Sequence, residues 1–453
     1  MIIDYDKIRE DNISEYGNGT RHLSFLSRLY TDRTHFIFEL IQNAEDAGAT
    51  DIHFNLFDDR LEITHNGRLF NELDVKGICG VDDGTKAEDL TKIGKFGVGF
   101  KSVYAFTNTP EVYSGDVSFK IENYVRPFSI PSKLENNYSK TLFILPLGTE
   151  KISEELARKE ISKCISNLGA RTLLFLKRIQ EIEYTLPDLS SGVYLREEKQ
   201  RGSARQVCVI GEKDGVEEVE NWLIFERPIQ VEESSQVVRV ELGFRFDAKD
   251  KNQQNDESIE RVKESPLFVF FPTEKETKLG FLIQGPYTTT PGRDNIIEDD
   301  WNKTLVNETA LLITETLPKI KELGLFTASF LETLPIDPND FPENSMFYPI
   351  FESVRDTLQK EALLPAEDGS FITADNALLA EADWLIDLLK DNQLKLLYLN
   401  GKKWIHQKVG KGALKEYFKK VLGIETIDTD GFASKVDNQF FKDNALLYLP
   451  TKY

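Results

Sequence analysis

The sequence predicts an α+β fold in three parts: an α/β sandwich at residues 1–175, a second α/β domain at 176–332 and a mixed segment at 333–453. Three observations lead to this prediction. In the first part a helix, a hairpin, a glycine-rich stretch and further strands follow one another, without regularly alternating βαβ units. The strand pattern changes after about residue 176. Three prolines then mark a linker at 334–345.

The elements of the first part follow from periodicity. A helix is predicted at 34–48, because apolar residues recur there at spacings of three and four. Gly48 is a suitable stop for this helix. Residues 51–57 alternate between apolar and polar side chains, and the chain returns after a turn as a second strand at 60–64. The remaining elements are an irregular glycine-rich stretch at 77–100, a helix at 100–106, strands at 117–123 and 141–147, and a helix at 151–168.

The later parts carry fewer signals. Strands are predicted at 237–246, 267–271 and 279–283, and a long helix at 303–323. Beyond the proline-rich linker the sequence shows no readable motif. The chain ends in an apolar run without a polar tail, and we expect the natural protein to continue beyond Tyr453.

Composition limits the classes of function. The chain has 453 residues with 40% hydrophobic and 29% charged side chains, which is typical of a globular protein without membrane spans. The N-terminus lacks the basic-then-apolar pattern of a signal peptide. The 3 cysteines lie far apart, which predicts reduced thiols and a cytoplasmic location. The 5 histidines show no metal-ligand spacing. The net charge of −21 disfavours general nucleic-acid binding, because a polyanion would be repelled.

A polar cluster lies on the helix predicted at 34–48. Glu39, Asn43 and Asp46 are four and three residues apart, which places them on one helical face beside the apolar stripe. Asn43 offers Mg²⁺ a hard oxygen without adding charge beside a triphosphate. Glu39, one turn earlier, is placed to orient and deprotonate a water molecule. Ordinary surface carboxylates share this spacing, so the cluster alone leaves both interpretations open.

A glycine-rich motif, GKFGVGFKS, follows at 94–102. Glycines let backbone amides approach phosphates closely, and the next helix adds its N-terminal amides. Lys95 and Lys101 add positive charge in an acidic protein. The motif is not a P-loop, because Phe100 stands where that loop has lysine. An ordinary glycine turn is the alternative. Residues 77–97, which overlap this motif, have the composition of a mobile lid or of a plain surface loop.

Taken in order, these motifs resemble the GHKL superfamily of gyrase, heat-shock chaperone, histidine kinase and MutL proteins. ELIQNAEDA resembles its N box, IGKFGVGFKSVY the glycine motif of heat-shock protein 90 chaperones, and KTLFILPL the late strand whose threonine, here Thr141, touches the nucleotide. Within the superfamily the chain is most similar to the chaperone and sacsin-type branch. The resemblance covers residues 20–185.

The resemblance implies a Bergerat-type sandwich that binds ATP or ADP, with Mg²⁺ held by Asn43 and water activated by Glu39. The nucleotide-contacting positions that it implies are Asn43, Asp46, His65, Asn66, Gly67, Lys95, Phe96, Gly97, Val98, Gly99, Phe100, Lys101 and Thr141.

A further segment, FLIQGPYTTTPGRDNI, resembles the middle-domain stretch of the chaperone ATPases. The resemblance gives Arg293 the role of the arginine that reaches the terminal phosphate. An arginine delivered from another domain can neutralise charge that develops on the γ-phosphoryl group. The alternative is an arginine in a polar turn beside Asp294 and Asn295.

One position departs from the superfamily pattern. The family usually has an aspartate after the hairpin, which binds the adenine amino group, and this chain has His65 there, followed by Asn66 and Gly67. A neutral imidazole nitrogen can accept one hydrogen bond from an amine, but it supplies no carboxylate charge.

Two functions remain open after this reading. The first is a Mg²⁺-dependent ATPase that drives conformational change in a chaperone-like, defence or remodelling protein, with a protein client or partner subunit and a possible homodimer. The second is a nucleotide-binding regulatory module with little hydrolysis, which His65 favours. A histidine kinase is disfavoured because no dimerising phospho-acceptor hairpin precedes the N box. A DNA-acting role is disfavoured by the net charge of −21.

Overall fold

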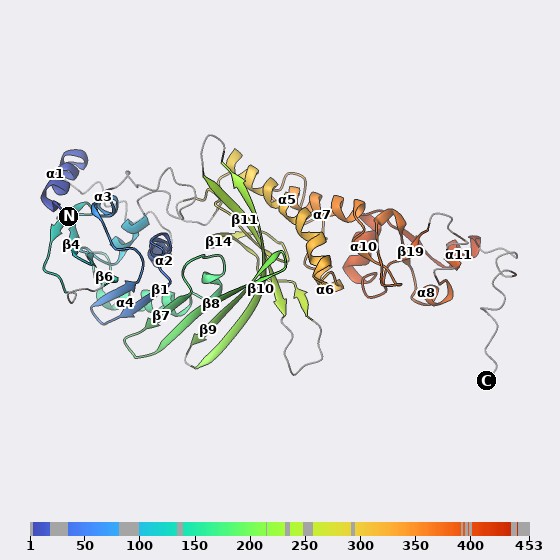
Figure 1. Cartoon of the computed structure of the whole chain (residues 1–453), viewed down its shortest axis with the longest axis horizontal. Coiled ribbons are helices and arrows are strands. Elements are labelled where there is room, and N and C mark those ends of the chain that lie inside the picture. The colour runs from blue at the N-terminus through green and yellow to red at the C-terminus, as the bar shows by residue number, and fades with distance from the viewer. Residues whose placement is uncertain are drawn as a thin grey trace.

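The computed structural model is a mixed α+β protein with one large mixed sheet. It describes residues 3–18, 35–80, 99–133, 139–213, 215–231, 236–247, 257–290, 295–390, 393–394, 397, 401–435 and 442. The molecule is elongated, with the N-terminal part at one end, the long strands in the middle and the C-terminal part at the other end (Figure 1).

The N-terminal part of the sheet is formed by a hairpin, a three-stranded meander and one strand that lies between them. Its strands are β1 (Asp51–Leu56), β2 (Arg60–His65), β3 (Glu111–Ser114), β4 (Val117–Glu122), β5 (Arg126–Ser129) and β6 (Thr141–Pro146), in the spatial order β1-β2-β6-β3-β4-β5. Its helices are α1 (Tyr5–Tyr16), α2 (Phe36–Asp46), α3 (Glu72–Cys79) and α4 (Glu154–Ser166), with the short 3-10 helices η3 (Gly99–Ala105) and η4 (Ala170–Leu173).

Most local predictions here are confirmed, but α3 extends to Cys79, within the stretch that was predicted to be irregular from residue 77. Helix α2 buries the apolar stripe that predicted it, including Ile37 and Ile41. Gly48 follows with a φ of 75°, a left-handed value that glycine adopts without strain. Strands β1 and β2 alternate between buried and partly exposed side chains. The helix expected at 100–106 is a 3-10 helix, and the one expected at 151–168 is the shorter α4.

The sheet continues across the border predicted at residue 175. Strand β7 (Glu181–Thr185) pairs in parallel with β1, and four long antiparallel strands extend it: β8 (Ser191–Arg201), β9 (Ala204–Lys213), β10 (Val216–Gln230) and β11 (Val237–Asp247). These strands form the curved middle of the molecule (Figure 1). The predicted domain borders remain predictions, and the sheet itself joins the first two regions.

The far end of the sheet carries β12 (Ser258–Glu260), β13 (Pro266–Val269), β14 (Phe271–Glu276) and β15 (Leu282–Gln284). The strand predicted at 267–271 is therefore divided, and Phe270 between its halves has a φ of 64°. Helices α5 (Asp300–Glu322), α6 (Ala328–Leu331) and α7 (Tyr348–Lys360) follow. Buried residues of α5 and α7 share one core with β10 and β11.

The C-terminal part contains a small parallel sheet in the order β19-β18-β20, with β18 at Ala377–Ala380, β19 at Lys403–Trp404 and β20 at Glu425–Ile427. Its other elements are the pair β16 (Leu364–Pro365) and β17 (Phe371–Ile372), the 3-10 turn η5 (Ala374–Asn376), and the helices α8 (Trp384–Leu388), α10 (Gly412–Lys420) and α11 (Thr429–Lys435). Within the described ranges, none of the helices is both long and apolar enough to cross a membrane.

Candidate functional site

Helix α2 holds the first group of candidate residues. Glu39 is buried with 7% exposure, whereas Asn43 and Asp46 are partly exposed. The arrangement follows from amphipathicity, because the apolar stripe packs in the core and draws the adjoining Glu39 below the surface. The structure thus gives the three residues one helical face, with the carboxylate of Glu39 as its buried end.

The glycine motif meets this carboxylate. A Cβ built on Gly99 would lie 2.0 Å from Oε2 of Glu39 and 2.8 Å from its Cδ, so any larger residue would displace the acid. Glu39 and Gly99 are 60 residues apart in the sequence. Tertiary folding therefore brings the acid to the last glycine of the motif.

His35 is a neighbour of Glu39 that the sequence analysis did not single out. Its Nε2 lies 3.4 Å from Oε1 of Glu39, one helical turn away. The available signal was the four-residue spacing of His35 and Glu39 on the face that Asn43 continues. An imidazole at this position can orient the carboxylate and exchange a proton with it.

The residue that replaces the family's aspartate is buried at the end of β2. His65 is 3% exposed and lies opposite Thr141 of β6 in the strand register. Its Nδ1 accepts a hydrogen bond of 3.1 Å from the backbone N–H of Gly67. Burial lowers the pKa of His65 to about 4, opposed by the charge of Asp51, so the ring is neutral at pH 7. The nitrogen expected to accept from a ligand amine is therefore already used by the protein.

A row of hydroxyls continues from His65 across the sheet. Thr141 pairs in register with Ser114 of β3, and their hydroxyl oxygens are 2.6 Å apart. Ser114 Oγ also accepts from the backbone N–H of Phe70 at 3.0 Å. Both hydroxyl residues are at most 1% exposed. Thr141 is thus the register partner of His65, and the contact of both residues with one ligand stays a prediction.

Gly67 and Asn66 both have structural roles in the described part of the chain. A Cβ on Gly67 would lie 2.9 Å from the Cβ of Ala47, so glycine is needed where α2 ends against the hairpin. Asn66 Oδ1 accepts from the N–H of Thr50 at 2.8 Å, and its Nδ2 donates to Thr50 Oγ1 at 2.6 Å. Asn66 thereby ties the end of β2 to the start of β1. Its role as a nucleotide contact stays a prediction.

Lys101 is placed differently from the phosphate-facing lysine that the motif suggested. Its side chain is fully buried, and Nζ donates to the carbonyl oxygens of Ile78 at 2.6 Å and Tyr124 at 2.5 Å. Burial lowers its pKa to about 8. In this structure the ammonium joins α3 and the β4–β5 turn to η3. Phe100, its neighbour, packs at 5.9 Å between ring centroids on Phe143.

Several predicted site residues lie outside the described residues. They are Lys95, Phe96, Gly97 and Val98 of the glycine motif, most of the lid candidate at 77–97, and Arg293 of the later segment.

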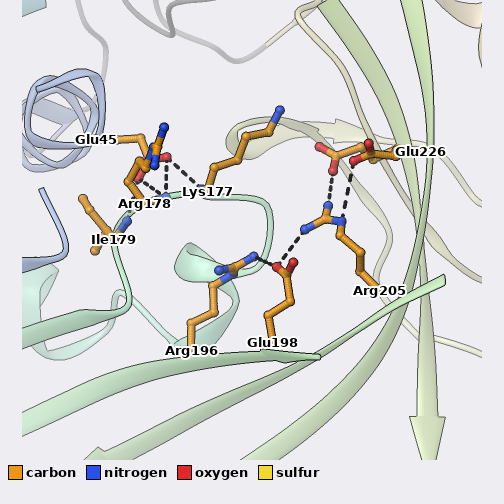
Figure 2. A network of polar contacts seen from close by, with 9 residues as sticks. Glu45, Lys177, Arg178, Ile179, Arg196, Glu198, Arg205 and Glu226 are labelled. Atoms are coloured by element: carbon orange, nitrogen blue, oxygen red, sulfur yellow. Dashed lines mark hydrogen bonds and ion pairs between the residues drawn. The ribbon is translucent and has the colours of Figure 1, made fainter. Parts of the chain in front are cut away.

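A second acid of α2 has a role that the sequence analysis missed. Glu45 is 8% exposed, and its carboxylate accepts from the backbone N–H groups of Lys177 at 2.7 Å, Arg178 at 2.9 Å and Ile179 at 2.9 Å. Figure 2 shows the carboxylate facing this turn of the chain, just before β7. Glu45 therefore fixes the segment that leads from the first region into the long strands.

An ion-pair network lies next to this turn (Figure 2). Arg205 of β9 contacts Glu198 of β8 at 2.9 Å and pairs with Glu241 of β11. Arg196 also pairs with Glu198. Glu241 is 1% exposed, and burial raises its pKa while Arg205 opposes the shift. The partly exposed arginine of β9 and the buried acid of β11 link two strands that flank β10, and removing the arginine would leave the buried carboxylate without this partner.

Helix α2 also touches the far end of the sheet. The rings of Phe38 and Phe271 of β14 lie 5.1 Å apart between centroids. Phe38 directly precedes Glu39, so the helix that carries the candidate acid contacts the first region through Phe36 and the later region through Phe38. A shift of β14 relative to the first region would therefore act directly on this helix.

The site so defined is a buried acid against a glycine, linked through aromatic rings to a buried imidazole and two hydroxyls, within a mixed α+β fold. A family model described as the Sacsin domain matches residues 61–122. Protein NO VEIN of Arabidopsis thaliana is 26% identical over 355 residues, which cover 70% of this chain and 12% of that protein. Sacsin of Homo sapiens is 36% identical over 112 residues, which cover 21% of this chain and 2% of sacsin.

These matches support a sacsin-like relationship, and the matched segment contains both His65 and Gly99. The chain spans 12% of the length of NO VEIN and 2% of that of sacsin. Among solved structures, the crystal structure of the N-terminal domain of a DNA repair protein covers 66% of this chain and 98% of its own, at 12% identity and a TM-score of 0.35. A similarity at that level does not bear on the function.

Proposed function

We propose that this chain binds and hydrolyses ATP in a Bergerat-type site of the GHKL superfamily. The observation that carries the proposal is the contact between Glu39 and Gly99, in which a buried acid fills the space that a Cβ would occupy. A general base and the end of a phosphate-cradling loop must lie side by side for a water to attack a terminal phosphate. The sacsin-like relationship agrees with this reading.

Magnesium fits the residues present, provided that it arrives with the nucleotide. No cluster of three or more acidic, histidine or cysteine side chains able to hold a metal is found among the described residues. Asn43 is partly exposed one turn from Glu39, where it can give a single oxygen. Mg²⁺ commonly takes one or two protein ligands and completes its shell with phosphate oxygens and water. Bound there, it would neutralise phosphate charge.

The remaining roles in the reaction are proposed for side chains of this chain. Glu39 would take the proton of the attacking water, and His35 at 3.4 Å would orient the carboxylate as a positioning residue. Thr141 and His65 would hold the base at the other end. Arg293 is proposed to meet the terminal phosphate from the later region.

We further propose that the nucleotide state drives conformational change in a larger chaperone-like or remodelling protein, with a protein client or partner subunit. Its support is the position of α2 between the two regions, where Glu45 bonds the turn at 177–179 and Phe38 contacts Phe271. A change at Glu39 would be transmitted through the same rigid helix.

The decisive experiment compares ATP turnover and ATP affinity in the chain and in Glu39→Gln, which keeps the shape that packs on Gly99. We expect retained binding and a loss of turnover of roughly 10²–10⁴-fold, the usual contribution of a positioned base. Glu155→Gln, an exposed acid of α4, is the matched control and should leave turnover unchanged. Equal turnover in all three folded proteins would refute the assignment of Glu39.

A second candidate function is a nucleotide-binding regulatory module with little hydrolysis. His65 favours it, because its acceptor nitrogen is already bonded to Gly67. Tight ATP binding together with turnover that Glu39→Gln does not lower would favour this module over the ATPase.

A further inference from the structure

We infer that an uncovered face of the long strands is a docking surface for a basic amphipathic helix of a partner protein. This docking face has an apolar centre and an acidic rim. The centre consists of Val193, Leu195, Ile210 and Val219, and the rim of Glu181, Glu183, Glu197, Glu212 and Glu217. The inference stands on this face and is independent of the proposed ATP site.

The two faces of strand β10 belong to different cores. Trp222 and Ile224 pack in the core that includes α2. Leu223 and Phe225, on the other face, pack in the core that includes α5 and α7. Helix α5 lies against β10 and β11 and covers this second face there (Figure 1). Val219 is on the same face as Leu223, because side chains alternate along a strand, yet it is 45% exposed. The layer that α5 forms therefore leaves Val219 uncovered.

The strand register joins apolar side chains of three strands on this uncovered face. Leu195 of β8 lies opposite Ile210 of β9, and Ile210 lies opposite Val219 of β10. Val193 is two residues from Leu195 and shares its face. All four side chains are at least partly exposed. The solvated face of an antiparallel sheet normally carries polar side chains, so a contiguous apolar row there marks an interaction site.

Acidic side chains border the apolar centre. Glu181 of β7 lies opposite Leu195. Glu212 of β9 lies opposite both Val193 and Glu217. Among the described residues, no lysine or arginine forms an ion pair with any of the five rim acids. Like charges in direct register destabilise a sheet, so a partner that supplies cations would relieve a repulsion that the chain itself leaves uncompensated.

The β7 side of the rim concentrates negative charge further. The carboxyl group of Glu181 is hydrogen-bonded to that of Glu183, and this bond together with burial raises the pKa of Glu181. Asp51 of β1 lies opposite Glu181 and is bonded by Lys140 at 3.4 Å. A negative potential beside an apolar row suits the side chains of lysine and arginine.

Shape and charge together define the occupant. Three neighbouring strands span roughly 10 Å, which matches the diameter of one helix. A helix with apolar residues at spacings of three and four can lay this stripe on the apolar centre, while flanking lysines or arginines meet the acidic rim. Nucleic acids and anionic lipids would be repelled by the same rim. The docked helix would extend, on the same face of the sheet, the helical layer that α5 forms over β10 and β11.

The probe for this face is a peptide of about 18 leucine and lysine residues, with leucines at helical spacing. Calorimetric titration of the whole chain should show binding, and a scrambled peptide of the same composition should bind about tenfold more weakly, because charge alone remains. The double variant Glu212→Lys and Glu217→Lys should also weaken binding about tenfold. Its matched control, Glu343→Lys and Glu361→Lys, changes the net charge equally at exposed acids elsewhere and should leave binding unchanged.

The apolar centre has its own matched pair of variants. Val219→Asn should weaken binding of the amphipathic peptide about fivefold, because it removes an apolar contact from the centre. Leu156→Asn on α4 is the control, since Leu156 is 44% exposed and Val219 is 45% exposed. Equal binding by both variants would show that the peptide does not use the apolar centre.

A third measurement needs no variant and stands even where a substitution fails to fold. Cys208 is half-buried on the docking face, opposite Glu197 and Asn221. Bound peptide should slow its alkylation by iodoacetamide severalfold. Cys164 of α4 is also half-buried and should react at an unchanged rate.

Three results would overturn the inference: no binding of the amphipathic peptide, equal binding of the scrambled one, or alkylation of Cys208 that bound peptide does not slow. A dimer of the chain that Val219→Asn disperses in sedimentation would assign the face to a second copy and would overturn the partner helix. These measurements involve no nucleotide, so their failure and a failure of the proposed ATPase are separate outcomes.

Discussion

Glu39 and Glu45 lie on the same helix and are almost equally buried, at 7% and 8% exposure, yet the described contacts of their carboxylates differ. The carboxylate of Glu45 is bonded by three successive backbone amides of the turn at 177–179. The carboxylate of Glu39 lies against Gly99 and within 3.4 Å of His35.

The difference teaches that burial alone does not mark a catalytic acid. The carboxylate of Glu45 is bonded by three fixed backbone amides, and these charge-assisted bonds stabilise the fold. The carboxylate of Glu39 lies beside a glycine and an imidazole, which is where the proposed function needs a general base. Under the proposed function Glu39 acts in the reaction, whereas Glu45 holds the turn at 177–179.

The largest expected effect separates the two acids by activity. Glu39→Gln should lower ATP turnover by roughly 10²–10⁴-fold. Glu45→Gln should leave turnover per folded molecule within about twofold, because its carboxylate bonds the turn at 177–179 and not the reacting groups. Single-turnover rates, normalised to folded protein, measure both. Equal losses in the two variants would erase the distinction.

The next prediction concerns the pH dependence of stability, to which His65 contributes. The pKa of His65 falls from an unfolded value of about 6.5 to about 4 in the folded protein, so the unfolded chain binds the proton first. The stability that the neutral ring provides is complete above pH 6.5 and is lost as the pH falls towards 4, by up to about 3 kcal/mol. Urea unfolding at pH 7, 5.5 and 4 tests this. A slope that His65→Gln leaves unchanged would assign the acid lability to other groups.

The free energy of unfolding should distinguish the two acids in the opposite sense, with the larger loss at Glu45. Glu45→Gln replaces a charged acceptor of three amides by a neutral one that can satisfy fewer of them, and should cost about 2 kcal/mol of unfolding free energy. Glu39→Gln should cost less. Chemical denaturation at pH 7 gives both values. A Glu45 variant as stable as the parent chain would show that the turn at 177–179 holds without it.

The smallest effect concerns the glycine that faces the acid. Gly99→Ala places a methyl group where Oε2 of Glu39 now lies, so the flexible carboxylate must turn aside. We expect turnover to fall about tenfold with ATP affinity nearly unchanged, because a displaced base affects the transition state most. Rates and affinities measured together decide this. Normal turnover would mean that Glu39 works from another rotamer.

Much of the fold and part of the site followed from the sequence. The spacing of Ile37 and Ile41 predicted α2, the alternation in 51–57 predicted β1, and Gly48 predicted the stop of α2. The structure adds that Gly48 has a φ of 75°. These features depend on neighbours within one or two turns of chain, for which local periodicity is sufficient. The union of Glu39 with the glycine motif was expected from the resemblance, and the structure brings Gly99 to it.

The sequence by itself determined where the polar residues stand on each element, because helical and strand periods fix which side chains share a face. Only the tertiary structure decided what those residues do. The carboxylate of Glu45 accepts hydrogen bonds from amides 132 to 134 residues away in the sequence. The ammonium group of Lys101 donates to the carbonyl oxygens of Ile78 and Tyr124. The backbone N–H of Gly67 donates to Nδ1 of His65, and Gly67 itself packs closely against Ala47. Partners of this kind are set by chain segments that meet only after folding, and buried polar groups take their roles from the partners that satisfy them.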